Sequence, residues 1–154
     1  MDKKMILQKG SKVAIVAVFL GICSWYFFTR IVSLQGNPIV VVRAGEGKIY
    51  AERVRSQEKM QRGLGGRKNL CKNCGMLFEF PERSRKAFWM KEMLVALDII
   101  WIDQGKVVHV EEKVSADDKR ILNPECLADK VLELPAGVAE KIGIREGVEV
   151  QLGG

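Results

Sequence analysis

AFWMKEMLVALDIIWID, residues Ala87–Asp103, holds the pattern from which the architecture of the domain follows. Polar and apolar residues alternate over Phe88–Met93, as in a strand with one buried face. Leu97–Ile102 is rich in β-branched and aromatic residues and predicts a strand that is buried on both faces. After a turn at Asp103-Gln104-Gly105, Lys106–Val114 alternates again. The sequence therefore predicts a three-stranded meander at the centre of the fold.

The remainder of the chain adds short strands and little helix. Turn residues and apolar runs predict further strands at Ile39–Arg43, Lys48–Val54, Gly75–Pro81, Lys130–Leu134 and Val148–Leu152. Two short helices are expected, Gln57–Leu64 after Ser56 and Ala136–Ile142 after Pro135. The expected fold class is mainly β: a single antiparallel β-sandwich or partly open barrel with two short helices.

The first 34 residues predict a membrane anchor. Val13–Phe28 carries no charge, and Lys12 to Leu34 bracket enough residues to span about 30 Å of hydrocarbon. Four lysines precede the apolar run, which places the N-terminus in the cytoplasm by the positive-inside rule. We expect two parts: residues 1–34, a short cytoplasmic N-terminus and transmembrane signal anchor, and residues 35–154, an extracytoplasmic domain on a single-pass cell-membrane protein.

Two alternatives to an uncleaved anchor are weaker. A cleaved signal peptide needs small residues after its apolar core, but Trp25-Tyr26-Phe27-Phe28 follows here. A lipoprotein signal needs a small residue before the acylated cysteine, and Ile22 precedes Cys23. Residues 1–34 also hold five basic groups and one acid, which leaves 20 basic and 18 acidic groups elsewhere. The net charge of +6 is therefore mostly a topology signal, and it argues against nucleic-acid binding.

Six separated blocks occur in an order and spacing that resemble a known family. They are Arg62-Gly63-Leu64-x-x-Arg67, Gly75-Met76-Leu77-Phe78-x-Phe80-Pro81, Phe88-Trp89-Met90-Lys91, Leu97-Asp98-Ile99-Ile100-Trp101-Ile102-Asp103, Val131-Leu132-Glu133-Leu134-Pro135-Ala136-Gly137 and Gly143-Ile144-x-x-Gly147. Together they resemble the domain of unknown function family 192 over residues 38–152.

This resemblance implies a small, mainly β domain that often follows a signal or anchor sequence in bacteria and archaea, and it implies no activity. The chain departs from the usual pattern of the family at several positions. Glu92-Met93 stands where Asn-Thr is frequent, Ala96 where Pro is frequent, Gly65 where Met is common and Val148 where Asp is frequent.

Three cysteines outside the anchor leave several chemistries open. Cys71 and Cys74 have a spacing that suits a structural disulfide, a redox pair or half of a zinc site. A disulfide between them, or of either with Cys126, is favoured in an oxidising compartment, because a zinc site lacks a second pair and a thioredoxin-like motif should open a helix. No cofactor and no metal site are predicted, although Met76, Met90 and Met93 could ligate a soft metal.

Charged residues inside apolar stretches mark a candidate binding site. Lys91 and Asp98 interrupt predicted strands, and buried charges require a partner, water or a ligand. They either pair with each other or line a cleft with Arg62 and Trp89 that accepts a small anionic ligand. The lone histidine, His109, alternates with valines and is expected to be a solvent-facing strand residue.

The function favoured by these patterns is a non-catalytic module that binds a ligand, an envelope component or a protein partner. One alternative is a hydrolase that uses Asp98 or Glu133 as acid or base with Lys91 as an electrostatic clamp. Another is a thiol or metal protein built on Cys71 and Cys74.

Overall fold

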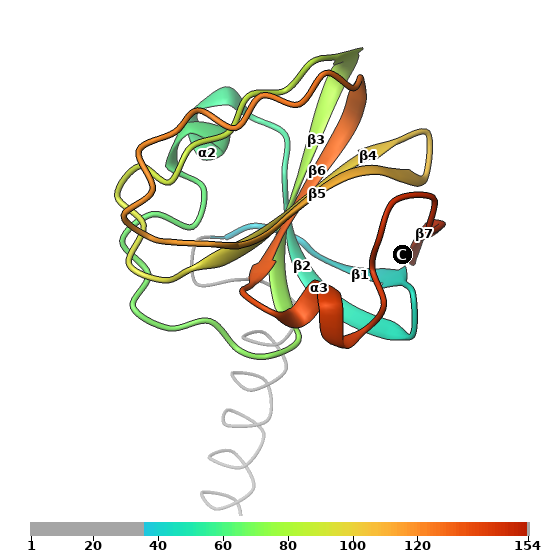
Figure 1. Ribbon diagram of the computed structural model, residues 1–154, viewed down its shortest axis with the longest axis horizontal. Coiled ribbons are helices and arrows are strands. Elements are labelled where there is room, and N and C mark those ends of the chain that lie inside the picture. Colours follow the sequence, from blue (N-terminus) through green and yellow to red (C-terminus); the bar gives the residue numbers. More distant parts are fainter. Residues whose placement is uncertain (1–35, 154) are drawn as a thin grey trace, which may run out of the picture. The chain divides into compact units, whose positions relative to one another are not determined.

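The computed structural model describes residues 36–153, so the predicted anchor lies outside the described residues. Within the described range, no helix is both long and apolar enough to cross a membrane. The elements in chain order are β1 (Ile39–Ala44), β2 (Gly47–Val54), α2 (Gln57–Arg62), β3 (Cys74–Ser84), β4 (Leu97–Asp103), β5 (Lys106–Val114), β6 (Ala128–Pro135), α3 (Val138–Lys141) and β7 (Val150–Gly153) (Figure 1). This content confirms the prediction of a mainly β domain with two short helices.

The seven strands form one sheet in the order β5-β4-β6-β3-β2-β1-β7. All neighbours are antiparallel except β2 and β3, which run parallel. Parallel neighbours need a long crossover, and the segment that contains α2 provides it. The prediction of a purely antiparallel sheet is therefore wrong at this one pair of strands.

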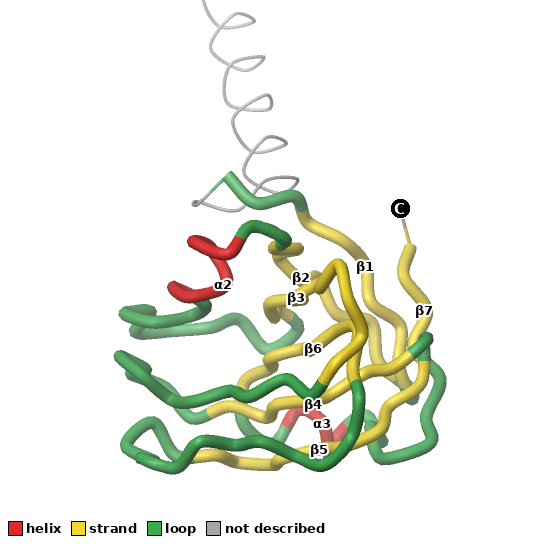
Figure 2. The backbone as a smooth tube through the Cα atoms, turned by 90° about the horizontal axis from the view of Figure 1, so that it is seen from above, coloured by secondary structure: helices red, strands yellow, loops and turns green. Residues whose placement is uncertain are grey.

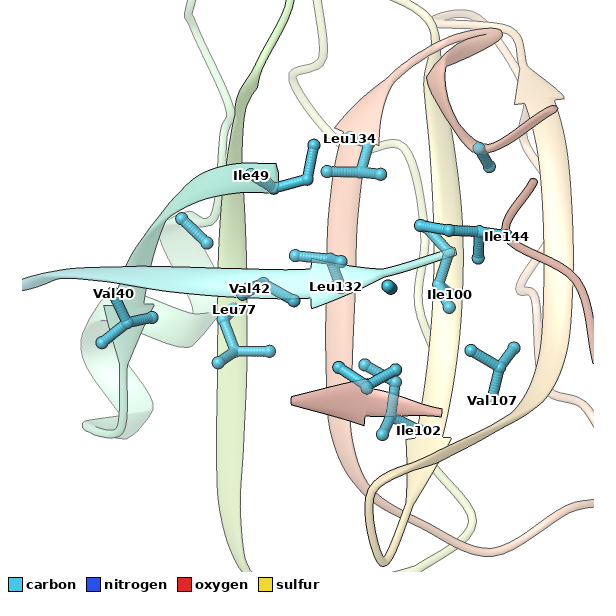
Figure 3. Close-up of a cluster of buried hydrophobic side chains, with 14 residues drawn as sticks. Val40, Val42, Ile49, Leu77, Ile100, Ile102, Val107, Leu132, Leu134 and Ile144 are labelled. Carbon is cyan, nitrogen blue, oxygen red and sulfur yellow. The ribbon is translucent and has the colours of Figure 1, made fainter. Parts of the chain in front are cut away.

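The sheet is a half-barrel whose two edges meet at one end. The start of β5 pairs with the segment before β7: the Val107 N–H donates to the Val148 carbonyl (2.9 Å), and the Gly147 N–H donates to the Val107 carbonyl (2.8 Å). The concave side encloses a first core, to which β1, β3, β4 and β6 contribute Val42, Leu77, Ile100 and Leu132 (Figure 3). This geometry agrees with the partly open barrel, which is one of the two architectures predicted from the sequence.

A second core covers the convex face of the central strands. Met76, Phe78, Ile99, Trp101 and Val131 project from β3, β4 and β6 into it. It is covered by α2 and by the long loops, which gather on one side of the molecule, away from β1 and β7 (Figure 2). The domain therefore buries both faces of its central strands, and the candidate site lies in the second core.

The predicted meander is confirmed in two of its three strands. β4 is buried along its whole length, and β5 returns beside it. Residues 88–93 do not form a strand, because within the described residues they form one isolated β-bridge, from Phe88 to Leu122, and no continuous ladder. Burial alternates only over residues 88–91, with Met90 buried between exposed Trp89 and Lys91, and the alternation ends at Glu92, which is exposed.

Candidate functional site

Two carboxylates stand in one row across the convex face of the sheet. Strand pairing places Glu52 of β2 beside Met76 of β3, Met76 beside Glu133 of β6, and Glu133 beside Ile99 of β4. Both acids are buried: Glu52 is 9 % exposed and Glu133 is 5 % exposed. Since a buried carboxylate is costly without partners, the surroundings of each determine its ionisation.

Glu52 is held by a fork of charge-assisted hydrogen bonds. Arg67 donates through Nη1 to Oε1 (2.5 Å) and through Nη2 to Oε2 (2.9 Å). The Asn37 amide adds a further donation to Oε2 at 3.0 Å. A bidentate arginine fixes both the orientation and the charge of a carboxylate, so Glu52 and Arg67 form a structural pair.

Glu133 has no such support. Its Oε2 is fully buried and accepts no hydrogen bond from the described part of the chain. Burial raises the pKa of Glu133 to about 8, although the positive charge of Arg67 acts in the opposite direction. Glu133 is therefore a neutral carboxylic acid at pH 7, with a proton available for donation.

A cavity of about 310 Å³ opens beside Glu133. It lies between α2, the Phe78–Phe80 part of β3 and the segment 85–93. Gly63 at the end of α2 lies close to the acid, because a Cβ built at this position would stand 3.9 Å from Glu133 Oε2. Glu133 thus lines the pocket beside Gly63, at what we call the buried end of the pocket.

Aromatic rings make up much of the remaining wall. Phe88 packs edge-on against Phe78 (5.0 Å between ring centroids) and Phe80 (6.5 Å). It also packs against Trp101 (5.9 Å), whose Nε1 donates to the carbonyl of Lys86 (2.7 Å). Trp101 therefore anchors the segment 85–93 over the sheet.

The charged residues of the pocket are one acid and four bases. The bases that line it with Glu133 are Arg62, Arg85, Lys86 and Lys91. Arg62 and Lys91 are exposed, and within residues 36–153 the Arg62 guanidinium forms no ion pair. The mouth of the pocket is accordingly positive, which favours an anion.

Of the four residues predicted to form a cleft, the structure brings together three. Arg62, Trp89 and Lys91 line the same pocket, and Glu133, the acid of the hydrolase alternative, joins them. Lys91 is not buried, since its side chain is 70 % exposed and approaches Glu92 at 4.0 Å. The predicted pairing of Lys91 with Asp98 is therefore wrong.

Asp98 serves the fold at another place. It is completely buried, and its Oδ1 accepts hydrogen bonds from the backbone N–H groups of Lys113 (2.8 Å) and Gly137 (3.0 Å). Its Oδ2 accepts from the N–H of Ala139 at 2.8 Å. Asp98 thus caps α3 from a neighbouring strand. With these acceptors occupied it is unsuited to acid–base chemistry.

The cysteines are divided between a disulfide and a free thiol. Cys71 and Cys74 are bonded to each other at the start of β3, and Cys126 is free. Burial raises the pKa of the Cys126 thiol, which disfavours the reactive thiolate. Among the described residues, no three His, Cys, Asp or Glu side chains are grouped as a metal site requires.

The methionines and the histidine considered from the sequence have ordinary surroundings. Met76 and Met90 are buried in the second core, whereas Met93 lines the pocket. His109 is half-buried, packs against Trp101 at 5.5 Å and approaches Glu111 and Glu146, each at 3.4 Å.

Comparison with known proteins agrees with this fold. The sequence has no match among curated proteins. A crystal structure from Sinorhizobium meliloti 1021, of a protein provisionally described as a transcription regulator, is similar with a TM-score of 0.72 and 24 % identity. The match covers 75 % of this chain and 95 % of that one, and at this identity it concerns the fold alone.

A second crystal structure, of a protein of unknown function from Novosphingobium aromaticivorans DSM 12444, is similar with a TM-score of 0.72 and 25 % identity. That match covers 79 % of this chain and 90 % of the other. The sequence profile of DUF192, described as "Uncharacterized ACR", matches residues 39–152, which is nearly the whole described domain. The chain therefore belongs to the DUF192 family.

Proposed function

We propose that this domain is a non-catalytic binding module for a small organic anion with an apolar body. The observation that supports it most is the convergence of Arg62, Trp89, Lys91 and Glu133 on one pocket. Aromatic and methionine side chains offer apolar surface to the body of such a ligand, and the basic groups at the mouth favour its negative charge.

The same geometry favours binding over hydrolysis. Acid–base catalysis by a pair of carboxylates needs both groups to be free, but Arg67 holds Glu52. Asp98 lies outside the pocket lining and is occupied by three backbone N–H groups. One neutral acid among aromatic rings is better suited to hydrogen bonding with a ligand than to turnover.

A simple probe of the pocket is 4-isopropylbenzoate, which joins a carboxylate to an apolar body. We expect it to bind, and we expect Arg62→Ala to weaken the affinity about 3- to 10-fold, because one cation at the mouth is lost. Isothermal titration calorimetry at low ionic strength measures this change. Raising the salt concentration should weaken binding to the wild type more than to the variant.

Two controls make this test specific. Arg145→Ala removes an exposed basic side chain outside the pocket and should leave the affinity unchanged. The uncharged analogue 4-isopropylbenzyl alcohol should bind more weakly than the benzoate and should not respond to Arg62→Ala. Equal affinity for the alcohol and the benzoate would contradict the assignment of an anionic ligand.

We also propose that residues 1–34 anchor the domain to the cell membrane with its N-terminus in the cytoplasm. The uncharged run Val13–Phe28 and the lysines before it support this topology. Alkaline phosphatase, which folds only outside the cytoplasm, should be active when fused after Gly154. A fusion to green fluorescent protein, which requires the cytoplasm, should be dark after export through the general secretory route; the reverse pattern would exclude the proposed orientation.

A further inference from the structure

The buried end of the pocket contains a carboxyl oxygen that has no hydrogen-bond partner among residues 36–153. Glu133 is 5 % exposed, forms part of the pocket wall, and has an oxygen without a hydrogen-bond donor among residues 36–153. A buried polar group without a partner is costly, so a ligand that satisfies it gains affinity. The chemical class of that ligand group follows from the charges around Glu133.

Burial without a hydrogen-bond donor keeps Glu133 neutral, although the charged groups on the surrounding elements are basic and favour its ionised form. Arg62 comes from α2, Arg67 from the loop after it, and Lys86 and Lys91 from the segment above the sheet. Arg67 directs both of its terminal nitrogens to Glu52, and it donates no hydrogen bond to Oε2 of Glu133. The acid is thus close to positive charge but receives no donor that would stabilise its ionised form.

A cationic ligand group is disfavoured at this position. An amine could pair with an ionised Glu133, but it would have to enter a pocket lined by four basic side chains and one acid. A neutral carboxyl group has a proton to donate, and no described residue accepts a hydrogen bond from its Oε2. An oxygen acceptor on an otherwise apolar ligand satisfies this proton without bringing a charge into the interior.

We propose that Glu133 acts as a neutral hydrogen-bond donor that selects ligands with a carbonyl-type oxygen at their buried end. This inference rests on the proposed function, and it narrows the ligand class to molecules with an anionic group at one end and an uncharged acceptor at the other. Aromatic or apolar atoms lie between the two ends, alongside Phe78, Phe80 and Phe88.

Three para-substituted benzoates test the inference in the full-length protein. 4-Acetylbenzoate carries the acceptor, 4-isopropylbenzoate has the same number and branching of heavy atoms without it, and 4-(aminomethyl)benzoate carries an ammonium group instead. At pH 7 we expect the ratio of acetyl to isopropyl affinities to be about tenfold higher in the wild type than in Glu133→Leu. Glu133→Gln retains an N–H donor at this position and should preserve the preference for the acetyl compound.

The pH dependence separates the proton of Glu133 from the shape of the pocket. The pKa of about 8 means that the donor is present at pH 7 and is lost as the pH rises through 8. The acetyl preference of the wild type should therefore fall between pH 7 and pH 9, while that of Glu133→Gln should stay constant. Arginine and lysine side chains and the benzoate ordinarily keep their charges over this range.

The possible results distinguish this inference from the proposed function. Equal binding of the acetyl and isopropyl compounds to wild type and Glu133→Leu would overturn the role of Glu133 but leave the anion-binding pocket in place. Tighter binding of the aminomethyl compound, lost in Glu133→Gln, would show an ion pair instead of a neutral donor. Failure of all three benzoates to bind would refute the proposed function and, with it, this inference.

Discussion

Replacing Asp98 by alanine should lower the free energy of unfolding by about 4 kcal/mol, because three backbone N–H groups lose their acceptor inside the protein. Two of these groups, on Gly137 and Ala139, begin α3, and the third lies on β5 at Lys113. The change therefore loosens α3 and one edge of the sheet together. Urea unfolding followed by tryptophan fluorescence measures the loss.

Asp117→Ala is a matched control for this experiment. Asp117 is an exposed aspartate in the loop after β5, and its side chain accepts a hydrogen bond from Ser115 within the same loop. Its removal should change the free energy of unfolding by less than about 0.5 kcal/mol. A similarly small effect of Asp98→Ala would mean that the three N–H groups find other partners, and Asp98 would not be an essential cap.

Trp101→Ala should be comparably severe, with a loss of about 3–5 kcal/mol of stability. Trp101 is completely buried, packs on Phe88 and donates to the carbonyl of Lys86. The substitution leaves a cavity in the second core and frees the segment that forms the outer wall of the pocket. We therefore expect the variant that remains folded to bind 4-isopropylbenzoate more weakly as well.

Trp89→Ala separates the two effects, because Trp89 lines the pocket but is 51 % exposed. This variant should retain its stability within about 1 kcal/mol while losing affinity for the benzoate. Chemical unfolding and calorimetric titration of both tryptophan variants give the comparison. If Trp89→Ala lost as much stability as Trp101→Ala, Trp89 would contribute to the stability of the core and not only to the wall of the pocket.

The sequence predicts the strands well where burial is unambiguous. β4 has apolar residues on both faces and β5 alternates, and both occur close to their expected positions. Residues 88–91 show the alternating burial of a strand but form only one bridge, at Phe88, because alternating burial requires only that a segment lies flat on a core. Periodicity reports which side chains are covered and does not report whether the backbone is paired.

The candidate site was predictable in part for a similar reason. The sequence identifies Asp98 and Glu133 as charges in apolar surroundings, but it does not say what satisfies each. The partners of Asp98 include backbone groups 39 and 41 residues away, at the N-cap of α3 and in its first turn, which no side-chain pattern marks. The sequence analysis does not identify the aromatic wall, although Phe78 and Phe80 alternate within Gly75–Pro81. Core and pocket positions share one face of this strand, so the pattern does not separate them.

β3 extends further along the chain than its sequence predicts. Pro81 predicts the end of the strand, yet β3 continues to Ser84, with a register shift after Glu79. An irregular pairing tolerates a residue that lacks an N–H, so proline interrupts the ladder without ending the strand. The parallel pairing of β2 with β3 was equally hidden, since it depends on the path of the segment that contains α2.

The pairing of β1 with β7 has a consequence for biosynthesis. Val42, near the beginning of the domain, lies opposite Leu152, and Arg43 lies opposite Gln151. The outer edge of β1 therefore stays unpaired until β7 is available. Until the ribosome has released residues 150–153, the first core is open along one side, and its valines and isoleucines face solvent or a chaperone. Stable burial of that core therefore requires β7, and a chain arrested before Val150 should be a substrate for quality-control proteases.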